Sequence, residues 1–60
     1  MIIIKIDLDC ADKFYTQLCN QAEKDKVFKA CGNVDEKWIM LRFSTEKQKE
    51  DWIKNNFKIN

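Results

Sequence analysis

The side chains of this 60-residue chain that could do chemistry are three cysteines and a few carboxylates. Cys10, Cys19 and Cys31 include no C-x-x-C pair, and the chain has no histidine. A structural zinc site normally takes four cysteine or histidine ligands, and a disulfide scaffold has an even number of cysteines. A free cysteine packs as a small hydrophobic residue. The pattern therefore predicts reduced thiols, with no metal site and no cofactor.

Groups suited to catalysis are scarce. Histidine, the usual acid–base group near neutral pH, is absent, and one glycine cannot form a glycine-rich phosphate loop. Ser44 is the only serine, and either Ser44 or Thr45 is expected to cap a helix. Asp7 and Asp9 could hold a divalent ion, but this spacing is more typical of solvated or capping carboxylates. Cys10 begins a predicted helix, where a thiol can be activated, yet it has no basic partner nearby in sequence. We predict that the protein is not an enzyme.

The composition predicts one small domain over residues 1–60. The formal net charge is +1, so neither an acidic tail nor a basic nucleic-acid arm is indicated. The opening apolar run, Met1 to Ile4, is far shorter than the roughly 20 residues of a membrane span, and we expect a cytoplasmic protein. The start at Met1 predicts a complete small gene product. Frequent Lys, Ile and Asn, no Pro and one Gly suggest an AT-rich genome such as that of many bacteriophages.

The first half of the chain predicts a strand and then a helix. Residues 1–8 alternate branched apolar and other residues with period two, which indicates a strand. Asp9 is the expected N-cap of the helix, and Asp12 lies in its first turn. The helix is expected to end near residues 23–25. Its apolar stripe consists of Ala11, Phe14, Tyr15, Leu18 and Ala22.

The second half predicts a hairpin and a second helix. Residues 27–31 and 38–43 read as strands, joined by a turn at Gly32 and Asn33. Thr45 to Gln48 matches the S/T-x-x-E/Q capping box of a helix that stops near residues 55–56. Residues 57–60 could be the helix end, a tail or a short fourth strand.

These elements give an α+β fold, a small two-layer sandwich in the order β-α-β-β-α. With a final strand the arrangement is ferredoxin-like (split βαβ), and without it an incomplete version with three strands. Both helices are expected on one face of an antiparallel-rich sheet. The first and third strands are the most apolar and are expected in the centre. The second and fourth carry Lys29 and Lys58, as edge strands often do.

The alternation assigns each strand residue to one of two sheet faces. The inner, helix-covered face is expected to hold Ile2, Ile4, Ile6, Phe28, Ala30, Ile39, Leu41 and Phe43, packed on Phe14, Leu18, Trp52 and Ile53. The outer face is expected to hold Ile3, Lys5, Asp7, Val27, Lys29, Cys31, Trp38, Met40, Arg42 and Lys58. No further element is left to cover this outer face.

An uncovered apolar patch ringed by cations usually marks an interaction site, and Trp, Met and Arg are enriched in interfaces. Trp38 could instead fold over Arg42 and Lys5 in a local cation–π cluster and bind nothing. The predicted interaction surface consists of Ile3, Lys5, Val27, Lys29, Trp38, Met40 and Arg42.

Three functions fit this surface. The favoured one is a non-enzymatic protein-binding module, a phage or mobile-element accessory protein that inhibits or modulates a larger host protein through its open sheet face or an edge strand. The second is single-stranded nucleic-acid binding, because cations beside an exposed tryptophan suit base stacking. The third is self-association through the same face, with Lys5 and Arg42 brought near their own copies.

Overall fold

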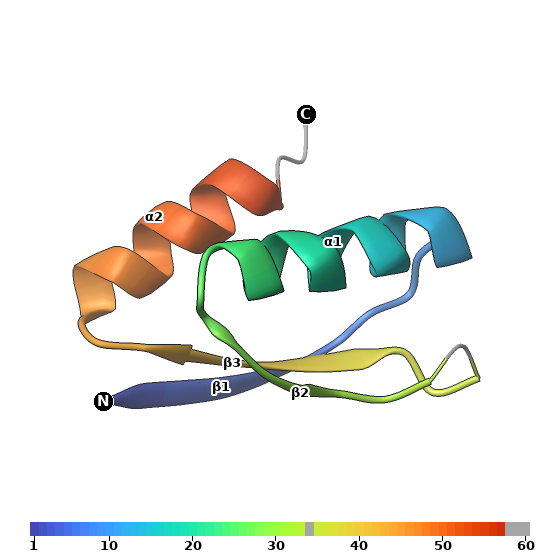
Figure 1. The fold of residues 1–60 in the computed structure, drawn as a ribbon, viewed down its shortest axis with the longest axis horizontal. Helices are drawn as coiled ribbons and strands as arrows, with labels where there is room; N and C mark the ends of the chain where they lie inside the picture. The colour runs from blue at the N-terminus through green and yellow to red at the C-terminus, as the bar shows by residue number, and fades with distance from the viewer. Residues whose placement is uncertain (34, 58–60) are drawn as a thin grey trace.

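The computed structural model describes residues 1–33 and 35–57 and places the chain in two layers. Three antiparallel strands form a sheet in the order β1-β3-β2. Figure 1 shows both helices on the same side of this sheet. The predicted α+β class, with three antiparallel strands and two helices, is confirmed. The elements are β1 (Ile2–Asp7), α1 (Asp12–Lys24), β2 (Phe28–Cys31), β3 (Trp38–Phe43) and α2 (Glu46–Asn56).

The possible fourth strand over residues 57–60, with Lys58, lies outside the described part of the chain except for Phe57. Phe57 directly follows α2 as its C-cap. Among the described strands β1 is therefore at an edge and β3 alone is central, so the predicted central place of the first strand depends on that fourth strand. Neither described helix is long and apolar enough to cross a membrane.

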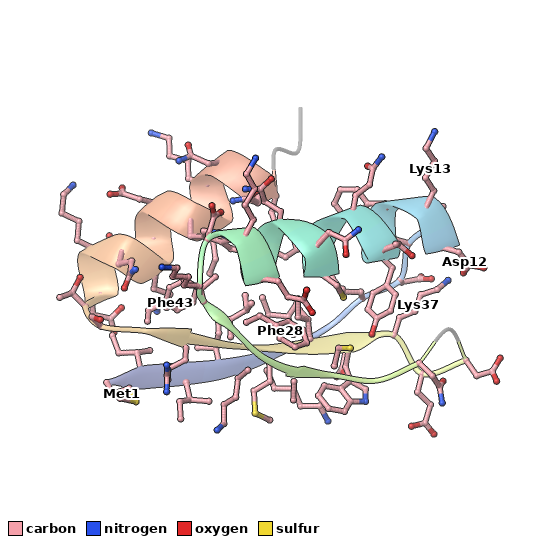
Figure 2. All side chains as sticks on the ribbon, viewed as in Figure 1. Met1, Asp12, Lys13, Phe28, Lys37 and Phe43 are labelled. Carbon is pink, nitrogen blue, oxygen red and sulfur yellow. The ribbon has the colours of Figure 1, made fainter. Side chains whose placement is uncertain are left out.

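Helix α1 begins later than the sequence indicated. Its N-cap is Ala11, which makes no side-chain capping bond, so the prediction of Asp9 as N-cap is wrong. Asp12 does lie in the first turn, as predicted. Its carboxylate is 2.8 Å from Lys37 Nζ, which also donates to the Cys10 carbonyl at 2.7 Å (Figure 2). Lys37, the residue before β3, thus binds the start of α1, where no side chain caps the helix.

Helix α2 begins with the predicted capping box. Thr45 is the N-cap, and its Oγ1 accepts a hydrogen bond from the Gln48 N–H at 3.1 Å. Gln48 Oε1 accepts in return from the Ser44 N–H at 2.7 Å. The helix ends at Asn56, within the predicted stop.

The core lies between the sheet and the helices, and β3 contributes its most deeply buried residues. The buried side chains are Tyr15, Leu18, Ala22, Val27, Ile39, Leu41, Phe43 and Trp52. Trp52 packs on Phe43 and Phe57, with ring centroids 6.1 and 6.2 Å away, and its Nε1 donates to Asp25 Oδ2 at 2.7 Å. Phe14, predicted to face the sheet, is instead 40% exposed, because the neighbouring Tyr15 takes the inward position on α1.

The chain enters β2 through a Schellman turn at the end of α1. Lys26 has a left-handed conformation with φ 63°, and its N–H donates to the Glu23 carbonyl at 3.1 Å. The Val27 N–H donates to the Ala22 carbonyl at 3.0 Å. This turn characteristically brings the residue after the left-handed one into apolar contact with the last helical turn. Val27 is accordingly buried beside Ala22, and its predicted place on the outer face is wrong.

A bulge in β2 overturns two further face assignments. Phe28 pairs with Leu41 and Ala30 with Met40, so β2 has one residue more than β3 between these pairs. Successive strand residues point to opposite faces, and an extra residue therefore exchanges the faces beyond it. Ala30, predicted inside, lies opposite outer-face Met40. Cys31, predicted outside, lies opposite buried Ile39.

Candidate interaction surface

The outer face of the sheet, on the side away from the helices, is the candidate site. Figure 2 shows side chains standing on both sides of the sheet, while the two helices lie only above it. Within the described ranges no helix or strand covers this face. We define the outer face by Ile3, Lys5 and Asp7 of β1, Ala30 of β2, and Trp38, Met40 and Arg42 of β3.

The β1–β3 register brings the apolar and charged members of this face together. Ile3 lies opposite Arg42, Lys5 opposite Met40, and Asp7 opposite Trp38. Directly opposite residues in an antiparallel pair have Cβ atoms about 5 Å apart, and diagonal neighbours are also within reach of long side chains. Ile3 is 49% exposed, whereas Trp38 and Met40 are half-buried. The result is one continuous apolar centre with cations beside it.

Trp38 is held in place by two neighbours. Lys5 Nζ lies 5.0 Å from the centroid of the indole ring, which is a cation–π contact. The edge of the indole lies against Gly32, where an added Cβ would collide with Trp38 Nε1 and the Glu36 carbonyl oxygen. The Lys5 part of the predicted local cluster is therefore present. Position 32 therefore requires glycine because there is no room for a side chain. Backbone conformation is not the reason, because the φ of Gly32 is not positive.

The charge of the outer face is positive. Lys5 and Arg42 are exposed there, and Lys29 is exposed beside it at the β2 bulge, against the single carboxylate of Asp7. None of these three cations takes part in the ion pairs found between described residues, which use Lys37, Lys47 and Lys49. Basic groups beside an apolar centre favour a partner whose surface is acidic around an apolar contact.

Of the seven predicted surface residues, the structure brings together Ile3, Lys5, Trp38, Met40 and Arg42. Lys29 is exposed at the bulge on the β2 side of this group. Val27 is in the core, and Ala30 takes the β2 position opposite Met40. Sequence reasoning missed Ala30 because an alternating pattern carries no mark of an inserted residue.

A second cluster of side chains that could take part in chemistry lies on the inner side, between α1 and β2. The Tyr15 hydroxyl is 3.0 Å from the carbonyl oxygens of both Gly32 and Trp38 and donates its hydrogen to this pair. Burial, followed by the nearby Cys31 thiol, raises the pKa of Tyr15 well above its usual value. Burial, followed by the charge of Cys31, also raises the pKa of the Cys19 thiol. Raised values keep these groups protonated, so the cluster is suited to structure and not to nucleophilic attack.

A groove along α2 is the remaining candidate. It is shallow, and Trp52 is its one apolar lining residue. Small-molecule sites typically enclose most of their ligand, whereas this groove is wide open to solvent. The lining residues are Thr45, Lys47, Gln48, Asp51, Trp52 and Asn55.

Compared with family models, curated proteins and solved structures, the chain matches none. The geometry of the outer face therefore carries the functional argument.

Proposed function

We propose that this chain is a protein-binding module that docks its outer face onto a larger protein and modulates it without catalysing a reaction. The observation that carries the proposal is the apolar centre of Ile3, Trp38 and Met40, which is bordered by cations and covered by no described element. Contiguous apolar surface with a polar rim often marks an interaction site. Trp and Arg are the residue types that most often dominate binding energy.

The fold supports a docking role because it presents this face on a rigid layer. The strand order β1-β3-β2 with both helices on one face corresponds, we infer, to a split βαβ arrangement before its last strand is added. The side chains of the face come from paired strands and not from loops, so little ordering is needed on binding. The composition adds the proposal that the protein is a phage or mobile-element accessory factor acting on a host protein in the cytoplasm.

A protein partner is favoured over a single-stranded nucleic acid by the surroundings of Trp38. Single-strand binding depends on bases stacking on an open aromatic face. Here the Lys5 ammonium lies over the indole, and the edge of the indole lies against Gly32. A base would have to displace Lys5, whereas an acidic protein surface can meet Lys5 and Arg42 where they stand.

The proposal is tested by comparing outer-face and helix-side variants as bait. Immobilised wild-type protein, Trp38→Ala and Phe14→Ala are exposed to the same bacterial lysate, and captured proteins are quantified by mass spectrometry. Phe14→Ala is the matched control, since Phe14 is an exposed aromatic residue on the helix layer. Replacing a central interface tryptophan by alanine typically costs more than about 2 kcal/mol of binding free energy. Trp38→Ala should therefore weaken capture by about 30-fold or more. Circular dichroism checks that both variants are folded.

Two results would count against the proposal. If Trp38→Ala retains the captured protein at full strength, the outer face is not the docking site. If instead a mixed-sequence oligonucleotide quenches Trp38 fluorescence and the effect disappears steeply as salt rises, nucleic-acid binding replaces it, because phosphate contacts are salt-dependent.

A further inference from the structure

The long edge of β1 that faces away from β3 carries backbone groups with no strand beside them among the described residues. The Leu8 N–H donates to the Lys37 carbonyl at 2.8 Å, which continues the β1–β3 ladder one residue beyond β1. Hydrogen-bonded pairs alternate along an antiparallel ladder. Leu8 and every second residue before it therefore face β3. The N–H and C=O groups of Ile3, Lys5 and Asp7 point outward.

The inner side of β1 is also less well covered than the rest of the sheet. Ile2, Ile4 and Ile6 are half-buried, whereas the three inner residues of β3 are at most 1% exposed. Helix α1 packs mainly against β2 and α2 against β3, so neither helix is centred over β1. A strand added at this edge would satisfy outward backbone groups and cover isoleucine side chains together.

We propose that β1 pairs antiparallel with β1 of a second copy, joining two sheets across a two-fold axis. A two-fold pairing of identical strands must place outward residues opposite outward residues, which fixes the side-chain faces to match. With the axis at Ile6, Lys5 of each copy lies opposite Asp7 of the other. On the inner face Ile6 meets its own copy, and Ile4 meets the partner's Leu8.

Charge selects this register over its neighbours. Moving the axis to Lys5 places that lysine opposite itself, and like charges directly opposite one another destabilise a strand pair. Moving the axis to Ile4 places Lys5 opposite Ile3 and leaves both ionic groups without a counter-charge. The register centred on Ile6 is the one of the three that forms two identical Lys–Asp pairs.

This dimer uses the edge of the sheet and, of the outer face, only Lys5 and Asp7 at that edge, so it does not rest on the proposed function. It would set two outer faces side by side in one continuous layer. Capture of a partner protein by Trp38 and dimerisation through β1 can therefore fail separately.

Sedimentation velocity over a range of protein concentrations tests the proposal with charge-reversed variants. The wild-type protein should form a dimer at high micromolar concentration. Lys5→Asp and Asp7→Lys should each raise the dimer Kd by about tenfold or more, because two attractive pairs become repulsive. An equimolar mixture of the two variants should recover the dimer, as should the doubly reversed chain, because acids again face bases.

Phe14→Ala is the control and should dimerise like the wild-type protein, since its side chain is exposed on helix α1. A wild-type chain that stays monomeric up to millimolar concentration overturns the proposal. So does a dimer that Phe14→Ala abolishes, or one that neither charge reversal weakens. Circular dichroism of every variant separates loss of pairing from loss of folding.

Discussion

Tyr15 links the inner side of the molecule to the candidate surface on the other side. Its hydroxyl donates to the carbonyl oxygens of Gly32 and Trp38, the two residues that also meet through the indole edge on the outer face. One buried side chain thus positions the backbone of the residue whose indole is proposed to bind. The sequence predicted Tyr15 as part of an apolar helix stripe, but its hydroxyl partners depend on a turn that only the three-dimensional structure brings beneath it.

At the same scale, we predict that the ionisation of the Cys19 thiol depends on the neighbouring Cys31. Because burial and Cys31 both raise the pKa of Cys19, Cys31→Ala should lower that pKa. The thiolate is the reactive form, so the pH at which Cys19 is half-maximally alkylated should fall in the variant. Iodoacetamide labelling rates between about pH 7 and pH 10, resolved by peptide mass spectrometry, measure it.

The midpoint of the rate profile reports the pKa of Cys19. The rate at a single pH would also rise if the Cys31→Ala change merely made the Cys19 thiol more accessible to the reagent. Cys10→Ala serves as the control, because Cys10 is not among the groups that shift the pKa of Cys19. An unchanged midpoint in Cys31→Ala would show that the two thiols do not interact.

At the scale of elements, the end of α1 determines how β2 enters the sheet. Lys26 occupies the left-handed position of the Schellman turn, where glycine is the usual residue. A left-handed conformation costs an ordinary L-residue roughly 1–2 kcal/mol relative to the helical one. The turn forms despite this cost, because Val27 is buried as a result.

Replacing Lys26 by glycine should therefore stabilise the protein, by about 1 kcal/mol once the greater entropy of glycine in the unfolded chain is subtracted. Urea denaturation followed by circular dichroism measures the change in the free energy of unfolding. Lys24→Gly is the matched control. Because Lys24 is in the last helical turn, this change should lower the free energy of unfolding by about 1 kcal/mol. Equal destabilisation by both changes would contradict the Schellman turn.

The elements themselves were largely predictable, and the errors in assigning strand residues to sheet faces lie at β2 and in the turn before it. The alternation in β1 and β3 and the capping box of α2 are local patterns, and each predicted its element closely. Val27, Ala30 and Cys31 were misassigned because two irregularities around β2, the Lys26 turn and the bulge near Lys29, carry no glycine to mark them. The outer-face residues of β1 and β3 were predictable from the alternation, and those of β2 were not.

At the scale of the whole molecule, stability depends on a thin core. Native domains are stable by about 0.05–0.15 kcal/mol per residue, which for 60 residues is about 3–9 kcal/mol. Leu41 is fully buried in the central strand. Leu-to-Ala changes in cores cost about 2–5 kcal/mol, so Leu41→Ala should remove a large share of the total stability.

Thermal and urea unfolding should show a markedly lower midpoint for Leu41→Ala, with partial unfolding at room temperature if the wild-type value is near the lower end. Met40→Ala, the neighbouring residue on the outer face, should change stability by less than about 1 kcal/mol, since Met40 is only half-buried. Similar losses for both variants would mean that the two faces are packed alike.

Because both helices lie on one side of the sheet, alternate residues of each strand have different roles. Every second residue packs in the core, and the residues between them point outward and contribute little to it. Mutations can then accumulate among the outward positions and alter the proposed docking surface while the architecture stays constant. A docking face of this kind suits a partner whose surface changes from one generation to the next.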